Sequence, residues 1–133
     1  MSNVKKQSKT LSVLLWISKV TLAVSLVGGA FIKLFMSPEE LSEMFPWTLE
    51  NRELLMITAF IDFILGIGFI LPSMNHHASK LNVISAYGTI VLMIAASIFH
   101  ISRGESSEIG INILFLLLAL FIIWGKQKQL KGE

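Results

Sequence analysis

The sequence contains no cysteine. The chain therefore cannot form disulfide bonds, carry out thiol redox chemistry or bind a metal through thiolates. Charged residues are scarce as well, at 15% of the 133 residues, whereas hydrophobic residues make up 53%. A redox role for this chain would therefore need a borrowed cofactor or a partner subunit, because the usual cysteine ligands of an iron–sulfur cluster are missing.

Internal repeats and low-complexity tracts are also absent from the sequence. Because secondary transporters are commonly built from inverted repeats with interrupted helices, this absence argues against a proton-coupled transporter. The formal net charge is +2, but the lysines gather near the two ends of the chain. Such a distribution fits anchoring at a membrane edge and argues against a protein that binds nucleic acid.

Apolar runs long enough to cross a bilayer dominate the remaining sequence. The mean hydropathy of +0.70 is above what a water-soluble domain of this size can bury. A helix needs about 20 apolar residues to span the hydrocarbon, so we expect spans at about residues 11–35, 53–72, 80–100 and 108–125. The sequence thus predicts an all-α fold, in which residues 1–133 form a single integral membrane domain built as a four-helix bundle.

A short helix is expected between the first and second spans. Ser37, Pro38 and Glu40 have the spacing of a capping box with proline at the first helical position. We expect this helix to lie at the membrane interface, with Trp47 at the headgroup level. Thr48 is the expected N-cap of the second span.

The basic residues predict the orientation in the membrane. One side of the bilayer would hold the basic residues of the tails and of the second loop, which are Lys5, Lys6, Lys9, Lys80, Lys126, Lys128 and Lys131. The opposite side has only Arg52 and Arg103 in its loops. The positive-inside rule therefore predicts a multi-pass protein of the cell (inner) membrane with both termini in the cytoplasm. A tight turn at Pro72, Ser73 and Asn75 would join the second span to the third.

A few charged side chains lie inside the apolar spans, where each costs at least roughly 2.5 to 3.5 kcal/mol on insertion scales. Asp62 lies in the middle of its span, too deep to reach water, so it needs either a partner or a proton. Such an acid is as compatible with a structural ion pair as with a functional role. Lys19 and Lys33 share one helix face, which we expect to point inward, although Lys19 is also compatible with snorkelling to the headgroups.

Glycines predict where helices pack closely in the membrane. Gly28 and Gly29 in the first span would let another helix approach. Gly66 and Gly68 lack the strand, turn and helix context of a nucleotide-binding motif. They are expected to serve helix packing instead.

Several polar side chains would fall in the outer half of the bundle. The predicted ligand-binding residues of an outer pocket are Lys33, Asp62, His100, Arg103, Glu105 and Asn112. A single histidine near a helix end is also typical of an interfacial hydrogen-bonding residue, so His100 alone does not identify a site. His76 and His77 are adjacent and would point to different sides of a helix, so no metal site is predicted.

Four segments of the sequence resemble the successive motifs of one membrane family. They are GGAFIKLF at residues 28–35, IDFILGIGFILP at 61–72, HISRGE at 100–105 and NILFLLLALFIIWGK at 112–126. By this resemblance the chain is identified as a member of the DoxX-like family, which implies a four-helix membrane bundle. The family more often has glutamate where this chain has Asp62, so the carboxylate is kept with a shorter reach.

The resemblance implies two different functions. Members of the family include subunits of a thiosulfate:quinone oxidoreductase, components of membrane oxidoreductase complexes, and a distant animal assembly chaperone for acetylcholine receptors. On the first hypothesis the chain is an accessory subunit of a membrane oxidoreductase, or binds a quinone or another small ligand. Lys33, Asp62 and His100 would then hydrogen-bond and protonate a quinone headgroup. No covalently bound cofactor is expected.

The alternative is a non-enzymatic, chaperone-like assembly factor that binds a lipid or a partner's helix. The same polar residues would then hold the bundle together and shape an interface. The expected partners are the lipid bilayer, a membrane or redox protein, and a second copy of the chain. Fold alone does not separate these functions, because one fold serves many activities.

Overall fold

The computed structural model describes residues 2–71 and 76–132, and the side chains of residues 9–71 and 80–128. Every regular element within those ranges is helical. In chain order they are α1 (Ser2–Phe35), α2 (Pro38–Met44), the 3₁₀ turn η1 (Pro46–Thr48), α3 (Arg52–Ile70), α4 (His76–Ser102), the 3₁₀ turn η2 (Ser106–Ile109) and α5 (Gly110–Gly132). The turn predicted at Pro72, Ser73 and Asn75 lies outside the described residues.

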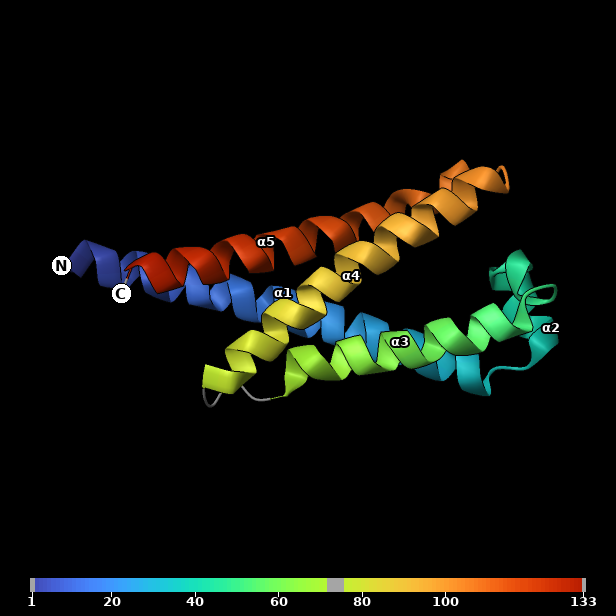
Figure 1. Cartoon of the computed structure of the whole chain (residues 1–133), viewed down its shortest axis with the longest axis horizontal. Helices are drawn as coiled ribbons and strands as arrows, with labels where there is room; N and C mark the ends of the chain where they lie inside the picture. The colour runs from blue at the N-terminus through green and yellow to red at the C-terminus, as the bar shows by residue number, and fades with distance from the viewer. Residues whose placement is uncertain (1, 72–75, 133) are drawn as a thin grey trace.

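Four segments of the described chain are long and apolar enough to cross a membrane, namely Lys9–Phe35, Arg52–Ile70, Lys80–Ser102 and Ser106–Lys128. Figure 1 shows both chain ends at the same end of the molecule, which we refer to as the terminal end. The opposite end, which carries α2, η1 and η2, is the distal end. The predicted all-α bundle is confirmed, and so is the short helix between the first two spans.

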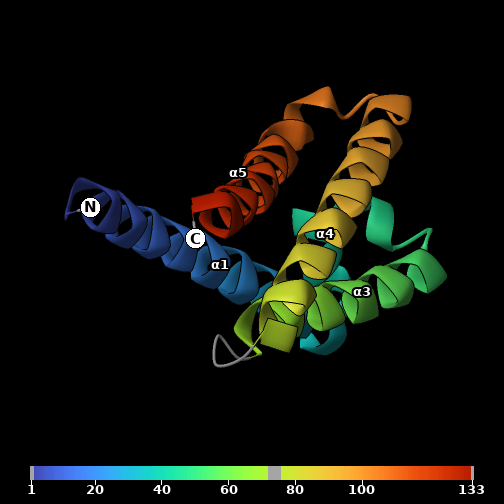
Figure 2. The ribbon, with the colours of Figure 1, turned by 60° about the vertical axis from the view of Figure 1, so that its left-hand side comes forward.

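The long helices form a ring of neighbours. Helix α1 packs against α3 and α5, and α4 packs against the same two helices. In Figures 1 and 2 the α1–α3 pair and the α4–α5 pair cross near the terminal half and diverge toward the distal end. The bundle therefore consists of two helical hairpins.

One side of each long helix is exposed and strongly apolar. Val24 of α1 and Ile64 of α3 are each 65% exposed, Val91 of α4 is 68% exposed and Leu117 of α5 is 57% exposed. Hydrocarbon solvates such side chains, and a helix satisfies its own backbone hydrogen bonds where water is absent. These faces fit lipid as the surrounding solvent.

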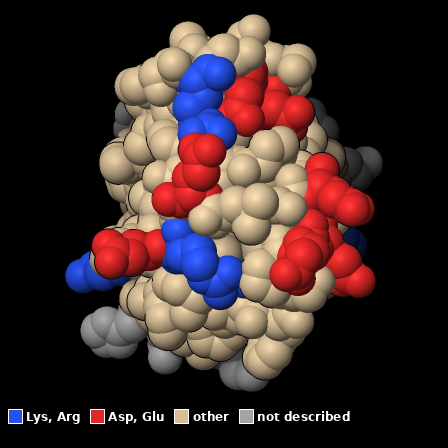
Figure 3. Space-filling view, turned by 90° about the vertical axis from the view of Figure 1, so that its right-hand side faces the viewer, with Lys and Arg blue, Asp and Glu red and all other residues tan. Residues whose placement is uncertain are grey.

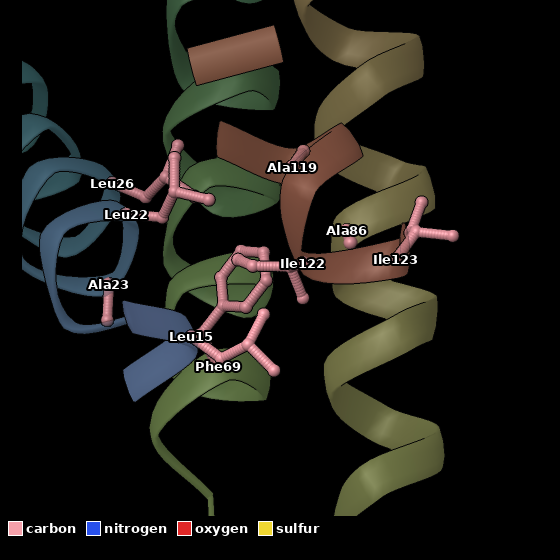
Figure 4. Packing of buried hydrophobic residues seen from close by; sticks show 9 residues of the cluster. All are labelled: Leu15, Leu22, Ala23, Leu26, Phe69, Ala86, Ala119, Ile122 and Ile123. Carbon is pink, nitrogen blue, oxygen red and sulfur yellow. The ribbon is translucent and has the colours of Figure 1, made fainter. Parts of the chain in front are cut away.

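The main apolar core lies in the terminal half of the bundle. Figure 4 shows Leu22 and Leu26 of α1, Phe69 of α3 and Ile122 of α5 converging there, within the principal buried cluster. Leu22 and Ile122 are completely buried. Because lipid tails are as apolar as this core, close packing and not the exclusion of water holds these helices together.

Glycines bring α3 close to both of its neighbours. A Cβ atom at Gly66 would overlap the side chain of Val27 on α1 and lie 3.2 Å from the Val27 backbone nitrogen. At Gly68 a Cβ atom would overlap the hydroxyl of Ser85 on α4. The predicted packing role of Gly66 and Gly68 is confirmed.

The glycine pair of α1 behaves differently. No atom lies within 4 Å of the place where a Cβ would stand at Gly28 or Gly29. The prediction that this pair admits another helix is therefore wrong for the described chain. The sequence identifies small residues, but their position around the helix axis decides whether a neighbour meets them.

Helix α2 begins as predicted, while the start of α3 does not. The Ser37 hydroxyl accepts a hydrogen bond from the Glu40 backbone N–H at 3.3 Å. Thr48 does not cap α3, because its hydroxyl donates to the Phe45 carbonyl at 2.8 Å. Asn51 precedes α3 instead and makes no side-chain cap hydrogen bond.

Trp47 lies inside the distal end and not at a lipid-facing surface. It is 7% exposed and belongs to a second buried cluster with Leu41 and Leu55. Its ring meets Phe99 of α4 edge to face, with 5.6 Å between ring centroids. The segment between α1 and α3 thus ties the first hairpin to the second, and the headgroup level of Trp47 stays a prediction.

Candidate functional site

The polar side chains of the spans lie on the inward faces of the helices. On α1, Lys19, Leu26 and Ala30 are 8%, 3% and 0% exposed, and Lys33 follows on the same face. The predicted inward direction of this face is confirmed. These positions are separated by seven, four and three residues, which are spacings of one helix face.

Lys33 and Asp62 join α1 to α3. The Lys33 Nζ lies 2.8 Å from Asp62 Oδ2 and 3.2 Å from Thr58 Oγ1. Thr58 donates its own hydroxyl proton to the Leu55 carbonyl at 3.0 Å, so its oxygen can accept from Lys33. The side chains of Lys33 and Asp62 are 17% and 9% exposed. Asp62 thus has a partner in Lys33, as its depth in the span requires of an ionised acid.

An ammonium group has three N–H donors, and Asp62 and Thr58 take two of those on Lys33. The remaining donor is available to a further acceptor. Lys33 therefore pairs with the carboxylate and keeps one N–H for a further acceptor.

The second polar group forms where α4 ends. The Glu105 N–H donates to the His100 carbonyl at 2.8 Å, and the Gly104 N–H donates to the Ile101 carbonyl at 3.0 Å. This is the Schellman pattern, which needs a left-handed residue after the helix, and Gly104 supplies it with φ 77°. The turn folds the chain back so that Glu105 Oε1 lies 3.3 Å from His100 Nδ1.

Arg103 completes this group and links it to the first hairpin. Its Nε donates to Glu105 Oε1 at 2.9 Å, and one terminal nitrogen lies 3.7 Å from Glu50 Oε2. Its guanidinium also lies over the Phe99 ring, 5.6 Å from the centroid. Sequence reasoning missed Glu50 and Phe99, because neither position belongs to a recognisable motif.

The pKa of Glu105 reflects these neighbours. Burial raises the pKa of the Glu105 carboxyl, but the hydrogen bonds from His100 and Arg103 and their positive charges outweigh that effect. The result is a pKa below the ordinary 4.5. Because the folded pKa is the lower one, the group stabilises the fold at pH values above 4.5, and this stabilisation is lost as pH falls through the folded pKa.

We expect the melting temperature of the detergent-solubilised protein to fall as the pH is lowered below 4.5, and Glu105→Gln to reduce that fall. The amide cannot titrate, so the linked proton uptake disappears. Glu43→Gln, at an exposed position of α2, is the matched control and should leave the pH dependence unchanged. Identical pH curves for the wild type and Glu105→Gln would contradict this assignment.

Asn112 occupies the inward face of α5 two residues after its start. It is 8% exposed and shares a stripe with Ala119, which is fully buried. Its Nδ2 is buried with no hydrogen-bond partner among the described residues. A buried, unpaired amide is costly without a compensating acceptor.

The predicted site residues therefore fall into distinct groups. Lys33 and Asp62 pair in the first hairpin, and His100, Arg103 and Glu105 gather at the end of α4. Within the part of the chain whose side chains are described, no side-chain hydrogen bond or ion pair joins the two groups or includes the Asn112 side chain. The single outer pocket stays a prediction.

Sequence reasoning also missed Asn82, which is 1% exposed and has a buried Oδ1 without a partner among the described side chains. Asn82 continues the inward stripe of α4 that passes through Thr89 and Met93 toward His100. Extending the spacing of that stripe back toward the terminal end would have found it.

The distal end is also where the acidic residues collect. Figure 3 faces this end and shows acidic side chains in separate groups with basic side chains beside them. The elements of this end carry Glu39, Glu40, Glu43, Glu50, Glu53, Glu105 and Glu108. The polar groups described above thus lie beneath or within a charged surface.

Comparison with known proteins gives one match. A family model described as "DoxX-like family" matches residues 17–122, well over half of the chain. A search of the curated proteins and one of the solved structures found no match. The matched range includes every residue of the two polar groups.

Proposed function

Because the chain belongs to the DoxX-like family and is a multi-pass membrane protein, we propose that it binds a quinone-type ligand in the distal half of its bundle. In this role it serves as an accessory subunit of a membrane oxidoreductase. The lipid-facing helices suit a partner and a ligand that are themselves confined to the bilayer.

The unpaired amide of Asn112 is the observation that carries this proposal. Its nitrogen is buried on the inward face of α5 with no acceptor in the described chain. In a water-free bundle a ligand oxygen would compensate that donor. A quinone headgroup has carbonyl oxygens that accept such hydrogen bonds. The Asn112 amide donor therefore fits a quinone.

Lys33 and His100 would hydrogen-bond to the other polar atoms of the quinone headgroup. Lys33 keeps one N–H beyond those directed to Asp62 and Thr58, and His100 lies on the inward stripe of α4. Lys33 also holds the Asp62 carboxylate at 2.8 Å, which places a group able to exchange protons beside that donor. A bound quinone would supply the electron-accepting chemistry that this cysteine-free chain lacks.

The basic residues support an orientation with both termini in the cytoplasm. The terminal end and its loop hold Lys5, Lys6, Lys9, Lys80, Lys126, Lys128 and Lys131. The basic residues at the distal end, outside the spans or at their edges, are only Arg52 and Arg103. By the positive-inside rule the ligand region then lies in the outer half of the cell membrane.

Purified protein titrated with a short-chain quinone tests the proposal. We expect quinone to co-purify with the wild type, and saturating quinone at a hundred times Kd to stabilise it by about 2.7 kcal/mol. Asn112→Leu and His100→Ala should each weaken binding about tenfold, since each removes a hydrogen bond in a dry site. Ser106→Ala, at an exposed distal position, is the control and should bind like the wild type.

The second candidate is an assembly factor that binds a partner's helix. It is favoured by a shallow, mainly apolar hollow on the outer side of α3, lined by Arg52, Glu53, Met56 and Ile57. No quinone response in any variant, together with stable capture of one membrane protein, would contradict the quinone proposal and support this one.

A further inference from the structure

Lys19 is a buried charge in the terminal half of the bundle. It is 8% exposed and lies one helical turn from Leu15 and close to Leu22, both in the apolar core. No described side chain accepts a hydrogen bond from it or pairs a carboxylate with it. A buried ammonium without a counter-charge is strongly unfavourable in such surroundings.

A second basic residue, Lys126, follows Gly125 on α5, where α5 packs against α1 one helical turn from Lys19. The positive charges of Lys19 on α1 and Lys126 on α5 repel one another. The two helices cross closely here, because a Cβ at Gly125 would overlap the side chain of Leu15.

Because α1 and α5 run in opposite directions, the side chains of Lys19 and Lys126 lean toward the same depth in the bundle. Side chains lean toward the N-terminus of their own helix. Lys19 therefore leans toward the terminal end, while Lys126 leans from that end into the bundle. Together the two lysines form a cationic pair.

The described chain offers this pair no acid. Of its nine acidic residues, Glu133 lies outside the described residues, and the seven other glutamates are at the distal end. Asp62 lies in mid-span and is paired with Lys33. Within the described residues, the counter-charge for Lys19 and Lys126 is therefore missing, and an anion from another molecule could supply it.

The depth of the pair indicates which molecule. Trp124 is 51% exposed, and Lys128 lies over its ring at 4.9 Å from the centroid. An exposed tryptophan beside a lysine is typical of the headgroup level of a bilayer. We infer that Lys19 and Lys126 bind a phosphate group, supplied by an anionic phospholipid of the leaflet at the terminal end.

Native mass spectrometry and thermal shift in a neutral detergent test this inference. The probes are phosphatidylglycerol, zwitterionic phosphatidylcholine and inorganic phosphate. We expect phosphatidylglycerol to be retained and to raise the melting temperature, with phosphatidylcholine retained far less. Lys19→Met and Lys126→Met should each weaken phosphatidylglycerol binding about fivefold or more, given the usual strength of a lysine near an anionic surface.

Lys80→Met is the matched control, because Lys80 is an exposed lysine at the same end of the bundle. It should retain phosphatidylglycerol like the wild type. Equal retention by the Lys126→Met variant and the control, or equal retention of both lipids, would overturn the inference. Lys126→Met decides the matter even where Lys19→Met fails to fold, since Lys126 is only partly buried.

The inorganic phosphate probe distinguishes a lipid headgroup from free phosphate as the source of the bound phosphate group. A higher melting temperature in millimolar phosphate, without any response to phosphatidylglycerol, would support a phosphate site but overturn its assignment to a lipid. This outcome is independent of quinone binding, because the cationic pair and the ligand region of the distal half share no residue.

Discussion

Asp62→Asn is expected to lower the free energy of unfolding by about 3 kcal/mol, the cost of leaving one member of a buried ion pair without its partner. Asparagine keeps the shape of the side chain but removes the charge that faces Lys33 Nζ at 2.8 Å. The Lys33 side chain is only 17% exposed, so water cannot replace the lost carboxylate. Unfolding in mixed micelles of mild detergent and sodium dodecyl sulfate measures the change.

The double variant Lys33→Met/Asp62→Leu tests whether the loss of stability comes from the unpaired charge. Removing both charges leaves no uncompensated group, so this variant should recover most of the lost stability. Thr58→Val removes only the weaker contact of Lys33 and should cost about 1 kcal/mol. An Asp62→Asn variant as stable as the wild type would contradict the ion pair as a link between α1 and α3.

Gly66→Ala is expected to destabilise the bundle by about 2 to 3 kcal/mol, within the usual range for an overpacked contact. The added methyl group would meet the backbone of α1, at 3.2 Å from the Val27 nitrogen and 3.3 Å from the Ala23 carbonyl oxygen. Backbone atoms cannot rotate away, so the two helices must move apart. The same unfolding measurement detects this.

Gly29→Ala is the matched control, since no atom lies within 4 Å of the added methyl group. Alanine favours the helix over glycine by up to about 1 kcal/mol, so this variant should be neutral or slightly more stable. Equal losses at Gly66 and Gly29 would show that helix propensity, and not contact between α1 and α3, governs both positions.

Much of the fold could be predicted from the sequence, because lipid leaves few choices. Apolar runs in a membrane must become helices that satisfy their own backbone, so the spans and the shared side of the termini follow directly. The cap of α2 was equally readable, since Ser37 and Glu40 act through neighbouring residues. Thr48 was assigned wrongly because its hydroxyl found a nearer carbonyl at Phe45.

Contacts between helices were harder to predict. They depend on how each helix is rotated about its axis and on how far it slides along its neighbour. The sequence placed Lys33 and Asp62 in one predicted outer pocket but could not choose a partner for the acid. The same uncertainty explains why Gly66 packs against α1 while Gly29 meets no atom.

The candidate site shows the same limit. The residues of the HISRGE segment gather because a local turn at Gly104 brings Glu105 back to His100. Asn112 and Asn82 became notable only once the structure showed buried amide atoms without partners. Whether an amide finds a partner depends on several helices at once, so no single segment of sequence could reveal it.

Single-cysteine labelling tests the central claim most directly, namely that lipid surrounds four spans and both termini share one side. Because the chain has no cysteine, each introduced thiol gives an unambiguous signal. In sealed vesicles of known orientation, a membrane-impermeant maleimide should label Thr10→Cys and Gln127→Cys from one side and Leu49→Cys and Ser106→Cys from the other. Val91→Cys, on a lipid-facing surface, should stay unlabelled, whereas labelling of Thr10→Cys and Gln127→Cys from opposite sides would contradict the account.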